Sequence, residues 1–234
     1  MTVLFFKEMN IDPNNEKDPN RDRFVLSKGH AAPVLYSTLA RRGYFPVEEL
    51  STLRKFKSRL QGHPSIQYLP GIDMSTGSLG QGISAAVGMA LAGKIDKKDY
   101  RVYTILGDGE LEEGQVWEAS MCAAHYKLNN LTAFIDFNGL QIDGDITKVM
   151  NPCPIDKKFE AFGWNVLVID GHNYEEIIDA IEKAKECKDK PTAVVCKTIK
   201  GKGVSFMENQ AEWHGIAPSR EQCEAALKEL GGEN

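Results

Sequence analysis

Short apolar runs alternate with helical stretches along most of the chain. Four runs rich in apolar and β-branched residues have the length and composition of buried strands: 101–106, 131–136, 164–170 and 192–198. Apolar residues recur at helical spacing, or small residues dominate, over 31–42, 46–60, 78–93, 113–127, 155–162, 174–187 and 219–230. Alternating strands and helices predict an α/β fold, with a mainly parallel sheet and helices on both of its faces.

No internal repeat, low-complexity tract or linker divides the chain, so we expect residues 1–234 to form a single domain. A loop rich in Asn, Asp and Pro covers 11–23, because these residues favour turns. The segment 78–93 is dense in Gly and Ala, and a helix with such small side chains can pack very closely against a neighbour.

Composition excludes several classes of protein. Hydrophobic residues make up 42% and charged residues 26% of the 234 residues, which is typical of a globular protein. The net charge is −5 and no polybasic run occurs, so we expect no nucleic-acid or membrane partner. Five cysteines without a CxxC pair argue against a zinc ribbon or a disulfide framework. Neither a signal peptide nor an apolar stretch of membrane-spanning length is present, so we expect a cytoplasmic location.

Polar residues follow the predicted strands at the points where the strands end. Asp108 comes just after the first run, Asn138 just after the second and Lys200 just after the fourth. In an open parallel sheet the carboxyl ends of the strands meet at one edge, where ligands bind. We therefore expect these three residues to converge although they are far apart in the sequence.

The residue types predict what that edge binds. A carboxylate, an amide oxygen and a free backbone carbonyl suit Mg²⁺ or Ca²⁺, and Mg²⁺ usually keeps water and phosphate oxygens as further ligands. The glycines beside Asp108 allow close approach of a bulky ligand, and a helix starting near Glu113 offers free N–H groups. Lys200 adds a positive charge for a phosphate. The pattern indicates a diphosphate held through a metal ion.

Several longer motifs make this chemistry more specific. The GDG…N pattern from 107 to 138 resembles the signature of thiamine-diphosphate enzymes. SKGHAAP (27–33), LQGHP (60–64), STGSLGQG (75–82) and KTIKGKG (197–203) resemble the N-terminal domain of transketolase, in family order. The resemblance runs from residue 2 to about residue 230 and is strongest to the N-terminal, thiamine-diphosphate-binding subunit of the split, two-chain transketolases.

The resemblance implies roles for individual residues. Mg²⁺, with Ca²⁺ as the alternative, would be bound by Asp108, Asn138 and the carbonyl of Leu140. Thiamine diphosphate would be contacted by His30, Gly77, Ser78, Leu79, Gly109, Glu110, Asn138, Lys200 and His214. The catalytic residues would be His30, His63, His214 and Glu113. Imidazoles titrate near neutrality and can move the protons of ketol transfer. Glu113 and Glu118 match acidic residues that link paired active sites in the family.

The resemblance also implies a partner. The chain would be the diphosphate-binding half of a transketolase of the pentose phosphate pathway, which moves a two-carbon ketol unit from a ketose phosphate to an aldose phosphate. We expect it to be inactive alone and to need a C-terminal subunit with the pyrimidine-binding domain, in a two-plus-two heterotetramer. Family members begin with further helical turns bearing a GHPGG-type motif, so we expect that segment to be missing and 3–6 to be the tail of a helix.

Other interpretations stay open at this point. The chain could belong to another thiamine-diphosphate enzyme, of the 2-oxoacid dehydrogenase or deoxyxylulose-phosphate synthase type, or be a non-catalytic cofactor-binding remnant. SKGHAAP and LQGHP favour transketolase. GQGISA (80–85) formally fits a dinucleotide-binding pattern, but no strand precedes it. We expect His125 to pack against its helix, and we assign no role to His172 or to the cysteines.

Overall fold

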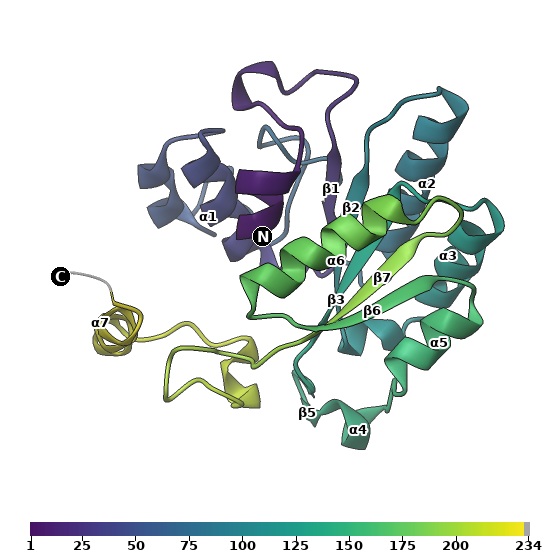
Figure 1. The fold of residues 1–234 in the computed structure, drawn as a ribbon. Helices are drawn as coiled ribbons and strands as arrows, with labels where there is room; N and C mark the ends of the chain where they lie inside the picture. Colours follow the sequence, from purple (N-terminus) through teal and green to yellow (C-terminus); the bar gives the residue numbers. More distant parts are fainter. Residues whose placement is uncertain (232–234) are drawn as a thin grey trace.

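Five parallel strands form the centre of the computed structural model, which describes residues 1–231 (Figure 1). In their order across the sheet they are β1 (Arg23–Leu26), β2 (Val102–Gly107), β3 (Leu131–Phe137), β7 (Thr192–Lys197) and β6 (Asn165–Asp170). Every neighbouring pair is parallel, so all five carboxyl ends lie along one edge of the sheet. A separate two-residue antiparallel pair, β4 (Leu140–Gln141) and β5 (Gly144–Asp145), follows β3.

Helices cover both faces of this sheet (Figure 1). The α-helices are α1 (Ala32–Arg42), α2 (Gln81–Ile95), α3 (Gly114–His125), α4 (Ile146–Val149), α5 (Ile155–Ala161), α6 (Tyr174–Glu186) and α7 (Arg220–Glu229). Helices α1 and α6 pack on one face, whereas α2, α3 and α5 pack on the other. Helix α7 lies away from the sheet, beyond the loop that follows β7 (Figure 1).

Two apolar cores result from the alternation of side chains along the strands. Phe24, Tyr103 and Val194 point toward α1 and α6, whereas their neighbours Val25 and Val102 point toward α2 and α3. Both faces of the central strands are therefore buried, which explains why they are continuous apolar runs rather than alternating ones.

The predicted α/β fold with a parallel sheet and helices on both faces is confirmed. All four predicted strands exist within a residue or two of their expected bounds. Helix α1 carries Pro33 in its first turn and ends at Gly43, whose φ of 99° provides the left-handed conformation of a helix stop. The expected surface helix at 219–230 is α7, which begins with a capping box at Ser219.

One predicted helix was wrong and one strand was missed. The predicted helix over 46–60 is only a short 3₁₀ helix, Val47–Thr52, because the backbone takes positive φ at Arg54 and Lys57. Strand β1 was not predicted, because four residues next to a polar loop give little periodic signal. The N-terminal segment 3–6 is helical, as expected, and the π-helix there spans Leu4–Glu8. Among the described residues, no helix is long and apolar enough to span a membrane.

An aromatic cluster stabilises the core beneath α5. Phe159 is fully buried, with its ring centroid 5.3 Å from those of both Trp117 and Trp164. We expect Phe159→Ala to lower the free energy of unfolding by about 3–5 kcal/mol, because the cavity cannot close fully. Urea unfolding measures the change. Phe56→Ala is the matched control, since Phe56 is 92% exposed and its loss should leave stability nearly unchanged. Equal midpoints for the two variants would contradict this packing.

Candidate active site

The loops that leave β2 and β3 meet at the carboxyl edge of the sheet. Asp108 directly follows β2, and its Oδ2 accepts a hydrogen bond of 2.6 Å from the backbone N–H of Gly139, which follows β3. Its Oδ1 accepts one of 2.9 Å from Gly109. Asp108 and Asn138 therefore lie beside each other, at the edge predicted from the strand ends.

The carboxylate of Asp108 is buried and has no ion-pair partner among residues 1–231. The residue is 2% exposed, and no cationic side chain of residues 1–231 forms an ion pair with it. Burial raises its pKa, and the hydrogen bonds from Gly139 and Gly109 only partly offset that effect. A buried carboxylate is strongly stabilised by a bound cation, so the environment of Asp108 fits a metal ligand.

The turn after β3 supplies further oxygen atoms. The Oδ1 of Asn138 accepts a 3.0 Å hydrogen bond from the N–H of Leu140, and Gly139 between them has a φ of 78°. Within the part of the chain that the structure describes, no group of three or more His, Cys, Asp or Glu side chains is arranged to hold a metal. An ion here would depend on one carboxylate together with amide and carbonyl oxygens, a set that suits Mg²⁺ or Ca²⁺ rather than zinc.

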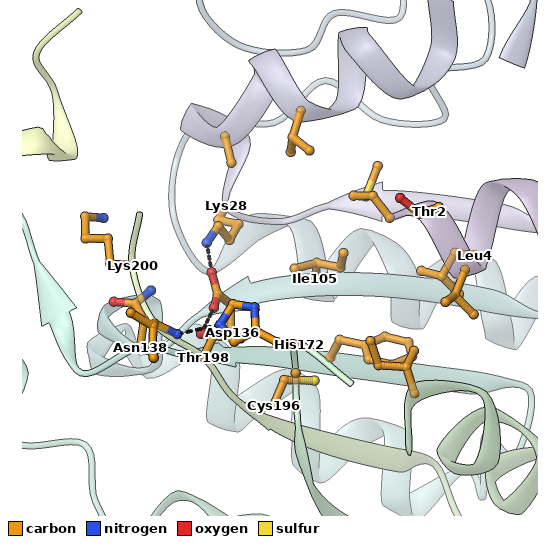
Figure 2. Close-up of a pocket in the computed structure, with 18 of the residues that line it drawn as sticks. Thr2, Leu4, Lys28, Ile105, Asp136, Asn138, His172, Cys196, Thr198 and Lys200 are labelled. Carbon is orange, nitrogen blue, oxygen red and sulfur yellow. Dashed lines mark hydrogen bonds and ion pairs between the residues drawn. The ribbon is translucent and has the colours of Figure 1, made fainter. Parts of the chain in front are cut away.

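A second set of strand-end residues was not foreseen from the sequence. The Nζ of Lys28, after β1, lies 2.5 Å from the Oδ2 of Asp136 near the end of β3. Thr198, after β7, donates a hydrogen bond to the other oxygen of Asp136 (Figure 2). Burial would raise the pKa of Asp136, but the charge of Lys28 and these hydrogen bonds outweigh it and hold that pKa below its ordinary value. The sequence signal that could have identified Lys28, Asp136 and Thr198 was their position at the ends of strands.

A cavity of about 460 Å³ opens beside these residues. Figure 2 shows Lys28, Asn138 and Lys200 toward one end of the cavity, Thr2 and Leu4 toward the other, and Ile105 between them. Asp108 and the three predicted catalytic histidines do not line this cavity. It adjoins the predicted site and shares Asn138 and Lys200 with it.

The three predicted site histidines cluster with Lys200. The rings of His30 and His214 are stacked, with centroids 5.1 Å apart and planes inclined by 25°. The Nζ of Lys200 is 3.2 Å from the Nδ1 of His214. His63 packs against Gly77, where a Cβ atom would lie only 3.0 Å from the His63 ring. Four segments distant in the sequence thus meet at one place.

Burial and nearby positive charge lower the pKa values of His30, His214 and Lys200. Burial, and then the nearby charges of Lys28 and His214, lower the pKa of His30 to about 4. Burial and the charge of Lys200 lower the pKa of His214 in the same direction. Burial and Lys28 also lower the pKa of Lys200. The imidazoles of His30 and His214 are therefore neutral near pH 7 and able to accept protons.

The remaining predicted contacts are arranged differently. Glu113 is exposed where α3 begins, and no hydrogen bond links its side chain to a histidine within residues 1–231. The carboxylate of Glu110 accepts hydrogen bonds from protein groups, and its contact with the cofactor stays a prediction. Gly109 lies so close to Gln141 that a Cβ would be 2.6 Å from its Oε1, and Gln141 was not foreseen. Ser78 and Leu79 fall between Gly77 and Gly80.

The other two histidines lie outside this cluster. His125 packs edge-on against Tyr126, with ring centroids 4.9 Å apart, as expected. The Nε2 of His172 accepts a 2.8 Å hydrogen bond from the backbone N–H of Ile199, so it fixes the loop after β7.

Comparison with known proteins decides the family. The family described as "Transketolase, thiamine diphosphate binding domain" matches residues 1–234. The chain belongs to this transketolase family. It is 50% identical over its whole length to a 6-deoxy-6-sulfo-D-fructose transketolase subunit of Clostridium sp., covering 85% of that protein. It is 45% identical over 98% of its length to an apulose-4-phosphate transketolase subunit of Phocaeicola vulgatus, covering 82% of it. Human transketolase is 46% identical over 98% of the chain.

Solved transketolase structures have the same fold. The enzyme from Campylobacter jejuni superposes on 99% of the chain with a TM-score of 0.92 and 36% identity. Transketolase from Leishmania mexicana gives 0.93 with 31% identity. The chain spans 37% and 36% of these two structures, and 36% of human transketolase. These relatives are transketolases or transketolase subunits, so assignment to another class of thiamine-diphosphate enzyme is not favoured.

The histidine cluster leads to a prediction about pH. His30 should titrate at about pH 4 rather than near 6.5, which the NMR signals of the five histidines can measure, with His30→Gln for assignment. Because the unfolded chain binds this proton more tightly, the contribution of His30 should make the fold less stable as pH falls from 6.5 toward 4.

Lys28→Met should raise the pKa of His30, since it removes a nearby positive charge. Lys202→Met is the control, because Lys202 is half exposed and lies 3.7 Å from Glu208. A His30 titration near 6.5 in the unmodified chain would refute the electrostatic description.

Proposed function

We propose that the chain binds thiamine diphosphate and Mg²⁺ at the carboxyl edge of its sheet and works as one half of a transketolase. The observation that carries the proposal is the buried carboxylate of Asp108 beside the Asn138 turn, which forms no ion pair within residues 1–231. Lys28, Lys200 and the histidine cluster supply positive charge and proton acceptors at the same edge. A divalent cation with a diphosphate matches this division of charge.

The residues present fit the cofactor. Asp108, Asn138 and the carbonyl of Leu140 would hold Mg²⁺, or Ca²⁺ in its place. Gly77, Ser78, Leu79 and Gly109 would line the path of the bound molecule, and Lys200 would face its phosphates. When bound, thiamine diphosphate supplies the carbon chemistry of ketol transfer.

The histidines would act on the substrate hydroxyl groups. His30 and His214 are neutral near pH 7, so each can accept a proton from a hydroxyl and return it later. Their stacking fixes both rings, and the contact of Lys200 with Nδ1 of His214 orients the second ring. His63 would line the approach of the sugar, next to Gly77. Glu113, exposed at the start of α3, would contact a second subunit and link paired active sites.

We expect the complete enzyme to need a second subunit. The chain covers about a third of single-chain transketolases, whereas two relatives that it nearly covers carry the word subunit in their names. A C-terminal subunit with the pyrimidine-binding domain would complete the cofactor site, in a two-plus-two assembly acting in the cytoplasm. The donor would be a ketose phosphate of the pentose phosphate pathway, and a panel that includes a sulfonated ketose and apulose 4-phosphate would define its specificity.

One prediction of the proposed function concerns the metal site. Asp108→Asn should weaken Mg²⁺-dependent binding of thiamine diphosphate by more than about a hundredfold, because the charge that binds the cation is lost. Asp22→Asn is a matched control: Asp22 is also buried and also accepts two backbone N–H groups, but at the opposite edge of the sheet. Calorimetric titration of the assembled enzyme gives both affinities. Unchanged affinity in Asp108→Asn would remove the basis of the proposal.

The second prediction concerns the partner. The purified chain should show no ketol transfer from a ketose phosphate, and addition of the C-terminal subunit should restore it. Coupled assays of aldose consumption before and after mixing measure the effect, and the partner alone is the control. Turnover by the isolated chain at the rate of the mixture would disprove the requirement for a second subunit.

A further inference from the structure

One buried carboxylate joins three loops that face the proposed cofactor. Glu110 is 2% exposed, and its Oε1 accepts hydrogen bonds from the Oγ of Ser27 and from the N–H of Gly80 at 2.9 Å. Its Oε2 accepts a third, of 3.1 Å, from the N–H of Gly107. We propose that Glu110 is a positioning residue that fixes these loops relative to one another, an inference that rests on the proposed function.

Each donor begins or ends a segment that carries a proposed contact. Ser27 follows β1 and precedes Lys28 and His30. Gly80 follows the Gly77–Leu79 segment and is the residue immediately before α2. Gly107 ends β2 and precedes the metal-site residue Asp108. The three segments are separated by many residues in the sequence, and Glu110 is hydrogen-bonded to all of them.

The same segments are in close backbone contact with one another. A Cβ atom on Gly29 would lie 2.7 Å from the backbone of Gly77 and Thr76. One on Gly82 would lie 2.5 Å from the Cα of Ser27. Because backbone meets backbone at these contacts, a shift of one loop displaces the others.

A carboxylate suits this position better than any other side chain. It accepts at both oxygens and donates nothing, so it can satisfy two N–H groups and a hydroxyl together. Glutamine has the same shape but only one acceptor atom. Whichever way its amide is turned, the NH₂ group faces a backbone N–H, and a buried donor loses its partner. Both oxygens of Glu110 are occupied by protein donors, so it acts through the loops and not on the substrate.

The test compares Glu110→Gln with Asp22→Asn in the full chain assembled with its partner subunit. Both changes replace a buried carboxylate that accepts backbone N–H groups, and Asp22 bonds Asn10 and Arg101 at 2.8 and 2.7 Å far from the site. Hydrogen exchange of peptides covering 26–30 and 76–82 reports loop order. Calorimetry with Mg²⁺ and thiamine diphosphate as the probe reports affinity, and melting temperature reports overall stability.

We expect Glu110→Gln to speed exchange in both peptides and to weaken cofactor binding about tenfold, whereas Asp22→Asn should lower the melting temperature but keep affinity within about twofold. Ser27→Ala removes one of the three hydrogen bonds to Glu110 and should weaken cofactor binding about threefold. This variant serves as the test if Glu110→Gln does not fold. Normal exchange and normal cofactor affinity in Glu110→Gln would overturn the proposal. If Glu110→Gln does not fold, the same result in Ser27→Ala would overturn it. An equal loss of cofactor affinity in Asp22→Asn would also overturn it. If the unmodified enzyme fails to bind the cofactor, the proposed function falls, while loop exchange still tests the role of Glu110.

Discussion

The buried carboxylate of Asp108 is the feature on which the rest of the site depends. An ionised acid in a low-dielectric environment is unfavourable unless a cation or several hydrogen bonds stabilise it. The protein provides two backbone N–H groups and no paired cationic side chain within residues 1–231. The sheet places this charge at its carboxyl edge, because five parallel strands end there and the loop after β2 is short. The fold thereby creates a position that a divalent cation stabilises.

The two nearby lysines do not form ion pairs with Asp108. Lys28 is held by Asp136, and Lys200 lies against His214, so neither lysine neutralises Asp108 through direct contact. The charge of Lys28 helps to lower the pKa of Lys200, and both lysines help to lower the pKa of His30. Asp108 would hold a bound metal ion, and Lys28 and Lys200 would attract the phosphate oxygens, so the cofactor would stabilise the charges of the acid and of the lysines together. Glu110 contributes differently, because its charge is satisfied internally and serves to order the loops.

Much of the fold and of the site was predictable, for a physical reason. Buried parallel strands are continuous apolar runs, and strand ends mark the ligand edge, so the meeting of Asp108 and Asn138 followed from strand positions alone. The prediction of a helix over 46–60 was wrong, because the spacing of apolar residues does not indicate the positive φ at Arg54 and Lys57. The pair of Lys28 with Asp136 was missed because a side-chain contact across three strands has no local sequence signal. The role of Glu110 was missed for the same reason, because two of its three donors, Ser27 and Gly80, are distant in the sequence.

The central claim is that one divalent cation binds between the loops after β2 and β3. A crystal of the chain assembled with its partner, grown with thiamine diphosphate and Mn²⁺ in place of Mg²⁺, tests it through the anomalous signal of manganese. The account predicts one strong peak at ligand distance from Asp108, from Asn138 and from the Leu140 carbonyl. A peak elsewhere in the crystal, with the diphosphate bound and Asp108 unligated, would contradict it.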